Sequence, residues 1–220
     1  MANKVLVVAE HLDGKLNAST ARTVSAAQAL SPDAIDIVVL AADPSAVAAQ
    51  AAQIGGVARV LAVANPANAH ALAQVLGPQV AQLAAGYSHV FGPSTTFGKD
   101  LMPVVAALLG VNQVSDLMAV EGSHTFKRPI YAGNAVTTVE APAGKTVVAT
   151  VRTASWPEAA GGGNAVVEAT SAEAPLPSHT RWIGLAAGSS DRPDLQSARR
   201  VVSGGRGVGS EENFRIVYSL

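Results

Sequence analysis

The stretch Val5-Leu6-Val7-Val8-Ala9 is a continuous apolar run that ends at Glu10. A run of this length without a polar face is typical of a strand that is buried on both sides of a parallel sheet. Similar runs follow at 35–41, 59–64 and 87–91, and segments with helical apolar spacing lie between and after them, at 19–30, 43–55, 65–83 and 98–109. This alternation predicts a doubly wound, mainly parallel α/β sheet, a fold whose ligands bind beyond the carboxyl ends of the strands.

After Gly110 the pattern changes to short strand-like segments separated by turn residues, at 114–120, 125–131, 135–140 and 146–152. We expect these strands to extend the sheet in an antiparallel direction or to form a second small sheet, with the last two paired as a hairpin. Residues 155–190 are rich in Ala, Gly, Ser and Pro, which favours irregular structure. Trp156 and Trp182 are expected to pin this segment to the domain surface, and docking of a partner is the alternative.

Near its end the chain contains a glycine cluster, Val201-Val202-Ser203-Gly204-Gly205-Arg206-Gly207-Val208-Gly209-Ser210. The pattern predicts a strand, a tight loop and a helix that begins near Ser210. Glycines let a backbone approach a ligand closely, free N–H groups at a helix start attract anions, and the guanidinium of Arg206 suits a phosphate. The spacing departs from the dinucleotide fingerprint because Ser210 stands where a third glycine is expected. The pattern alone leaves a phosphate loop and an ordinary strand-to-helix turn open.

The composition excludes several classes of function. The 220 residues carry a net charge of −1 and only 4% aromatic residues, so we expect no binding of nucleic acid. The absence of cysteine excludes disulfides, thiolate nucleophiles and iron–sulfur ligation by this chain. No signal peptide is recognisable, and no apolar run approaches about 20 residues. We therefore expect a cytoplasmic protein that does not span a membrane.

Other candidate sites give weaker signals. The stretch from Gly92 to Asp100 resembles a phosphate loop, but its glycine spacing and its Asp100 depart from that motif. Some contact with an anion at this strand end stays open. The five histidines show no metal-ligand spacing, and we expect them to be surface or capping residues. The stretch from Tyr131 to Asn134 predicts a turn between two strands.

Several of these motifs, in this order, resemble the alpha subunit of electron transfer flavoprotein over the whole chain. They are the Gly-Pro-Ser loop at 92–94, Tyr-Ala-Gly-Asn-Ala at 131–135, Ser-Asp-Arg-Pro-Asp-Leu at 190–195 and Gly-Gly-Arg-Gly at 204–207. The resemblance implies a first domain similar to adenine nucleotide alpha hydrolases, with its nucleotide site left empty, whereas the sister beta subunit fills that site with AMP or a second FAD. It also implies that Gly205, Arg206 and Gly207 bind FAD, with Arg206 near the pyrophosphate and the flavin edge.

The same resemblance implies an electron carrier rather than an enzyme. It implies a heterodimer with a beta subunit, electron donors among the flavin dehydrogenases such as acyl-CoA dehydrogenases, and a membrane quinone oxidoreductase as acceptor. The expected organisation is an N-terminal partner-docking platform at 1–190, a linker at 191–198 and the start of an FAD-binding domain at 199–220.

The resemblance implies that the chain stops one strand and one helix into that FAD-binding domain. We therefore expect a fragment that binds FAD weakly or not at all. The alternatives are a small nucleotide-binding protein that uses the N-terminal sheet, and a structural module that docks a partner subunit.

Overall fold

The computed structural model describes residues 3–184, 186, 195, 198 and 200–220. The chain divides into two compact units, and the division falls between Trp182 and Ile183. The linker that we predicted at 191–198 lies outside the described residues except for 195 and 198, so the predicted domain boundaries stay predictions.

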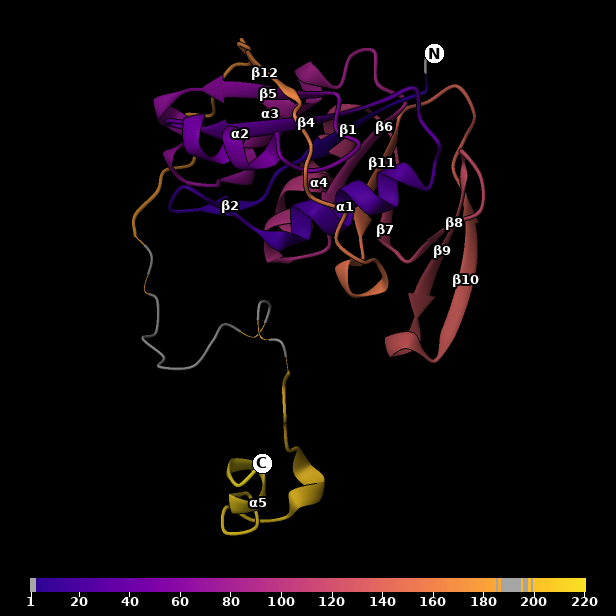
Figure 1. The fold of residues 1–220 in the computed structure, drawn as a ribbon, viewed down its shortest axis with the longest axis vertical. Coiled ribbons are helices and arrows are strands. Elements are labelled where there is room, and N and C mark those ends of the chain that lie inside the picture. The colour runs from indigo at the N-terminus through magenta and orange to yellow at the C-terminus, as the bar shows by residue number, and fades with distance from the viewer. Residues whose placement is uncertain (1–2, 185, 187–194, 196–197, 199) are drawn as a thin grey trace. The chain divides into compact units, whose positions relative to one another are not determined.

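The first unit is built on a sheet of seven strands, all paired in parallel (Figure 1). The order across the sheet is β12-β5-β4-β1-β6-β11-β7. The strands are β1 Lys4–Val8, β4 Ala34–Ala41, β5 Arg59–Ala64, β6 His89–Pro93, β7 Gln113–Leu117, β11 Val147–Val151 and β12 Val166–Ala169. Strand β1 lies in the middle with its apolar residues fully buried, as its sequence predicted.

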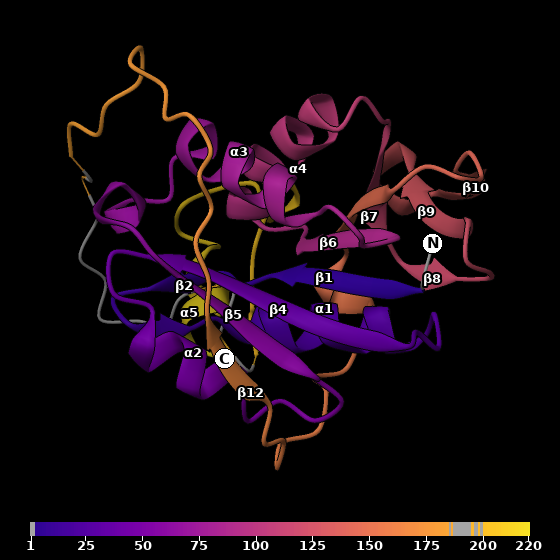
Figure 2. The same cartoon turned by 90° about the horizontal axis from the view of Figure 1, so that it is seen from above.

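Helices cover both faces of this sheet, which confirms the doubly wound α/β class. Figure 2 shows α1 and α2 on one side of the strands and α3 and α4 on the other. The helices are α1 Ala18–Gln28, α2 Ser45–Ala51, α3 Ala73–Leu83 and α4 Thr96–Leu108, with a 3-10 helix at Pro66–Ala69. Two apolar cores result: Val24 and Val47 pack with the strands on one face, and Leu76 and Leu101 on the other.

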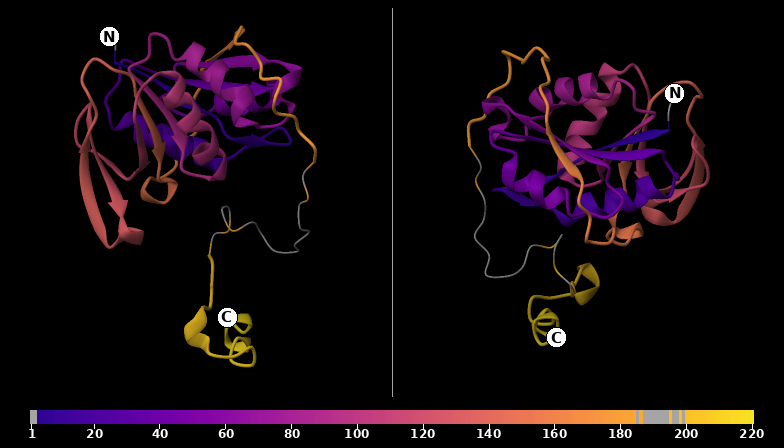
Figure 3. Two further views of the ribbon diagram at one scale, coloured as in Figure 1. Left: turned by 180° about the vertical axis from the view of Figure 1, so that it is seen from behind. Right: turned by 45° about the horizontal axis from the view of Figure 1, so that its top comes forward.

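A small antiparallel sheet stands beside β7 and corrects the predicted pairing. Its strands are β8 Ala119–Val120, β9 Thr125–Ile130 and β10 Ala135–Glu140, and the 3-10 turn Tyr131–Gly133 joins the last two. We call residues 119–140 the arm (Figure 3). The predicted hairpin of β10 with β11 is wrong, because β11 joins the main sheet between β6 and β7. Strand β11 is buried throughout, whereas β10 alternates between half-buried and exposed residues, and only the former pattern suits a central parallel strand.

The segment after residue 155 is more ordered than its composition indicated. Strand β12 pairs with β5 at the edge of the main sheet, where Val166 is 67% exposed. The expected pinning by both tryptophans is confirmed. The ring of Trp182 stacks on His70 with centroids 4.3 Å apart, and Trp156 packs against the core beside α1. A short hairpin of β2 His11–Leu12 and β3 Lys15–Leu16 completes the first unit.

The second unit contains a 3-10 helix at Arg206–Val208 and the helix α5 Arg215–Tyr218. The strand predicted at Val201 and Val202 is not formed: both side chains are 53% exposed. A strand needs a neighbour to take its backbone hydrogen bonds, and residues 200–220 offer none. The predicted helix start is confirmed in part, since Ser210 Oγ accepts a hydrogen bond from the backbone N–H of Asn213 over 3.2 Å.

Candidate functional site

The glycine cluster of the second unit forms a hollow of about 550 Å³. Two hydrogen bonds curl its backbone, from Val208 N–H to the Gly205 carbonyl (3.0 Å) and from Gly209 N–H to the Arg206 carbonyl (3.1 Å). The left-handed φ of Gly209, 82°, ends this turn and needs a glycine. The hollow is lined by Gly205, Arg206, Val208, Gly209, Ser210, Glu211, Phe214 and Tyr218.

Some glycines of this cluster are required by packing within the second unit, and others are not. A Cβ on Gly204 would lie 2.8 Å from the Phe214 ring and 3.0 Å from Val208 and Val217, so Gly204 is needed to pack the unit itself. A Cβ on Gly205 or Gly207 would meet no atom within 4 Å, and neither residue has a left-handed φ. The fold of the described chain therefore gives no reason for glycine at these two positions, whereas close approach of a ligand to the backbone does.

The side chain of Arg206 is exposed and forms no ion pair with any described residue. Its five N–H donors are free for an anion such as a phosphate. Helix α5, with only four residues, adds little dipole to such a site. The residues present thus fit one edge of a phosphate-bearing ligand, and they do not enclose a whole dinucleotide.

In the loop from Gly92 to Asp100, by contrast, the glycines are in close contact with neighbouring residues of the chain. A Cβ on Gly98 would lie 1.8 Å from the Pro93 carbonyl oxygen, and one on Gly92 would lie 2.7 Å from the sulfur of Met102. Gly98 is therefore required by packing against the backbone, whereas a side chain at Gly92 would force Met102 to shift. Thr95 caps α4 by accepting a hydrogen bond from Gly98 N–H over 3.4 Å. This loop is a tight helix start in which the glycines serve packing.

The histidines include one exception to the expectation of surface or capping roles. His89 is only 1% exposed, lies between Phe91 and Phe126, and joins β6 to the arm. Its Nε2 donates to the Ser123 carbonyl over 2.7 Å, and its Nδ1 lies 2.8 Å from the Ser88 hydroxyl. Burial lowers the pKa of His89 below its ordinary value. Among the described residues no cluster of metal-ligating side chains is found.

A buried charge network at the amino-terminal edge of the main sheet was missed from the sequence. Asp36 is 1% exposed. Its Oδ2 forms an ion pair with Arg59 Nη2 at 2.6 Å and accepts a hydrogen bond from the Tyr87 hydroxyl at 2.5 Å. The sequence did contain a signal for this ion pair, namely a charged residue inside the apolar run 35–41. Asp36 lies in register with Arg59, the first residue of the neighbouring strand β5. The role of this network is structural, since ligands of such sheets bind at the opposite edge.

Comparison with known proteins agrees with this architecture. The model of the family described as "Electron transfer flavoprotein domain" matches residues 5–175. The chain belongs to the electron transfer flavoprotein family. An electron transfer flavoprotein subunit alpha of Pseudomonas aeruginosa is 46% identical over 217 residues, which cover 98% of this chain and 69% of that protein. One of Paracoccus denitrificans is 46% identical with the same coverage, and a mitochondrial one of Dictyostelium discoideum is 38% identical, covering 64% of its length.

Membership of the alpha subunits of electron transfer flavoprotein makes this chain an electron carrier component rather than an enzyme. The family model ends before the glycine cluster, whereas the alignments with the relatives extend over 98% of the chain. Among the described residues of this electron transfer flavoprotein chain, no helix is long and apolar enough to cross a membrane.

Proposed function

We propose that this chain contributes one edge of an FAD site through Gly205, Arg206 and Gly207, and that 199–220 is the start of the FAD-binding domain. The observation that carries this is the pair of glycines, 205 and 207, for which the chain itself provides no steric or conformational reason. Bound FAD would supply the redox chemistry. Arg206 would hold negative charge of the cofactor, because its guanidinium has no competing carboxylate among the described residues.

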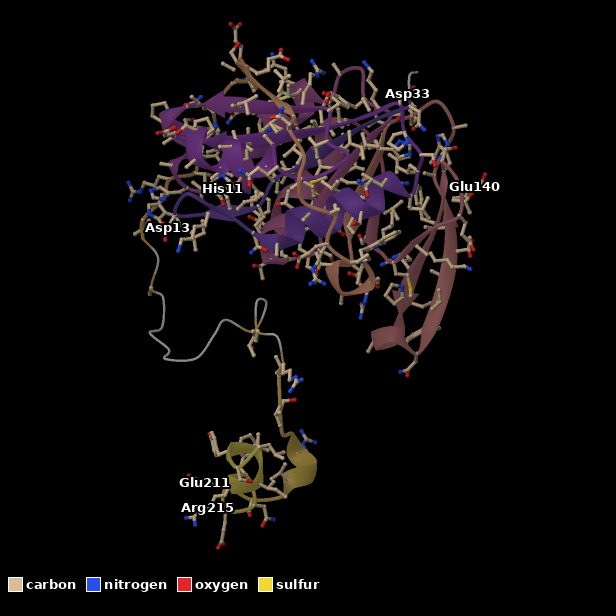
Figure 4. All side chains as sticks on the ribbon, in the orientation of Figure 1. His11, Asp13, Asp33, Glu140, Glu211 and Arg215 are labelled. Carbon is tan, nitrogen blue, oxygen red and sulfur yellow. The ribbon has the colours of Figure 1, made fainter. Side chains whose placement is uncertain are left out.

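The 220-residue chain is expected to bind FAD weakly, and Arg206→Met should weaken that binding about tenfold, the effect of losing one charge-assisted hydrogen bond. Flavin fluorescence during titration measures the FAD affinity of the wild-type chain and of the variant. Arg215→Met removes the same charge at a residue of the second unit (Figure 4) that does not line the hollow. It is the matched control and should change the affinity less than about twofold. Equal losses in both variants would contradict the proposed role of Arg206, and a purified chain that holds stoichiometric FAD would contradict the expected weak binding.

We further propose that the arm docks a beta-type subunit, with residues 1–190 as the platform. The arm ends in a turn in which Tyr131 and Ala132 have left-handed φ values of 50° and 55°. Such strain in residues other than glycine is concentrated at functional sites. The Tyr131 side chain is 79% exposed, and the Asn134 amide fixes the turn by donating to the Tyr131 carbonyl over 3.0 Å. An exposed aromatic residue on a fixed turn is a typical anchor of a protein interface.

Tyr131→Ala is therefore expected to weaken assembly with a beta-type subunit by about 2 kcal/mol, a roughly thirtyfold rise in the dissociation constant. Asn134→Ala should act in the same direction more weakly, because it only loosens the turn. Sedimentation or titration calorimetry with the co-expressed partner measures both constants. Leu108→Ala removes a 54% exposed apolar side chain from α4 and serves as the control. Unchanged constants for both arm variants would count against docking there.

In this proposal the assembled protein takes electrons from flavin dehydrogenases, such as those that oxidise acyl-CoA, and delivers them to a membrane quinone oxidoreductase. The alpha-subunit relationship supports this role. The competing proposal, a purely structural docking module, predicts partner binding with no flavin signal at all. Saturable binding of FAD that Arg206→Met weakens and Arg215→Met does not would exclude the purely structural module.

A further inference from the structure

The segment that follows strand β12 is the last part of the first unit. It leaves the sheet on the side of α3 (Figure 2), where the Thr170 N–H donates to the Ala62 carbonyl over 2.9 Å and Ala172 packs against the apolar core. Residues 173–181 form no hydrogen bond or ion pair with another described residue. We call residues 173–182 the strap. Its attachment to the first unit therefore depends on its last residue, Trp182.

Trp182 attaches the strap by stacking on His70. The two ring centroids lie 4.3 Å apart, and the ring planes are inclined by 16°. Trp182 nevertheless stays 39% exposed, so other side chains do not enclose the stack. Beyond the burial of its area, an aromatic stack shifts an equilibrium by about tenfold at most. A contact of this strength, open to solvent on one side, holds the strap and can still be released while the sheet stays folded.

His70, by contrast, lies on a loop that is firmly fixed. It follows the 3-10 helix Pro66–Ala69, and its carbonyl accepts a hydrogen bond from the Leu72 N–H over 2.8 Å. In that helix the buried amide of Asn68 exchanges two hydrogen bonds, of 3.1 and 2.7 Å, with the buried amide of Gln79 in α3. Buried amides that satisfy each other fix the segments that carry them. The stack thus joins a fixed loop to a loosely attached strap.

The stack also lies at the boundary between the units, because the second unit begins at Ile183, directly after Trp182. We propose that His70 and Trp182 form a releasable latch that sets where the connector to the second unit begins. With the latch closed, the connector begins at residue 183. When the latch opens, the ten residues of the strap join the connector and lengthen its reach by at most about 35 Å. The latch is independent of the proposed FAD edge, since it concerns only how the first unit holds the strap.

Trypsin reports on the latch because the exposed Arg181 stands directly before Trp182. The protease must take up the residues on both sides of this bond, so cleavage depends on the population of the open strap. His70→Ala should raise the rate of cleavage after Arg181 about fivefold or more, followed by intact mass. His70→Phe keeps a ring for the stack and should restore the wild-type rate. Cleavage after Arg206 in the second unit is the internal control and should not change.

Distances between spin labels test the length of the connector. The chain has no cysteine, so Glu140→Cys and Leu220→Cys can carry one label on each unit. In this labelled chain, His70→Ala and Trp182→Ala should each shift the distances measured by double electron–electron resonance to longer values. His179→Ala, which removes an exposed histidine of the strap, should not.

Two outcomes of these experiments would overturn the proposal. One is an unchanged distance distribution in both latch variants, even with faster cleavage after Arg181. The other is an equal shift in His179→Ala. Should His70→Ala fail to fold, Trp182→Ala still decides the question, because it changes only the partly exposed end of the strap.

Discussion

Replacing Arg59 with methionine is expected to lower the free energy of unfolding by about 3 kcal/mol, because it leaves the buried carboxylate of Asp36 without its charged partner. This is the low end of the range for a buried pair, since the Arg59 side chain is itself 43% exposed. The carboxylate of Asp36 is 1% exposed, and Arg59 Nη2 lies 2.6 Å from its Oδ2. Without the guanidinium, that charge stays buried with the Tyr87 hydroxyl as its remaining side-chain partner. Urea denaturation followed by circular dichroism measures the loss.

A double variant separates the buried charge from the lost packing. In Asp36→Leu/Arg59→Met the buried charge is gone, so stability should recover by several kcal/mol relative to Arg59→Met alone. Arg22→Met is the surface control: its pair with Glu158 is 3.1 Å long, but both side chains are well exposed, so the change should be below about 1 kcal/mol. If Arg59→Met were no worse than Arg22→Met, the network would not carry the stability assigned to it.

The sheet could be predicted from the sequence where the apolar runs are long. The run 59–64 coincides with β5, and the runs beginning at residues 5 and 35 became β1 and β4 within one residue at either end. These strands are buried on both faces, so a nearly continuous apolar run is expected of them, and Asp36 in β4 is accommodated by its ion pair with Arg59. The resemblance to the alpha subunits could also be recognised from the sequence, because it rests on short motifs that follow one another in the same order as in that family.

Pairing partners were not predictable in the same way. Strands β10 and β11 follow each other after a turn, which favours a hairpin, but the burial of β11 places it between β6 and β7 instead. Strand β12 has only four residues in a glycine-rich stretch, and its partner β5 lies about a hundred residues earlier in the chain. Contacts over such separations depend on the tertiary fold rather than on local sequence.

The candidate site likewise has features that the local sequence predicts and others that depend on the tertiary fold. The glycine cluster was visible in the sequence, yet the pattern could not say which glycines serve packing and which stay open. Gly204 and Gly98 are required by neighbours in space, whereas Gly205 and Gly207 are not. The stack of Trp182 on His70 likewise depends on the tertiary fold, because the two residues come from distant parts of the chain.

Acidification from about pH 7 to about pH 5 is expected to destabilise the first unit through His89. Burial lowers the pKa of His89 below the value of about 6.5 that it has in the unfolded chain. The hydrogen bond to the Ser123 carbonyl offsets part of this, and the neighbouring His124 lowers the pKa further. Above that value both states are neutral and the contribution to stability is complete. As the pH falls below 6.5, the unfolded chain takes up the proton first, so stability declines until the pH passes the folded-state pKa.

The variant His89→Gln isolates this effect from the titration of carboxylates. A glutamine amide can still donate to the Ser123 carbonyl, but it does not titrate, so the dependence of the unfolding free energy on pH should be flatter than in the wild type between pH 5 and 7. His89→Ala should cost about 3 kcal/mol or more at any pH, because it leaves a ring-sized cavity between Phe91 and Phe126. His179→Gln, far outside this core, is the control for histidine content. Parallel pH profiles for the wild type and His89→Gln would show that the proton uptake occurs elsewhere.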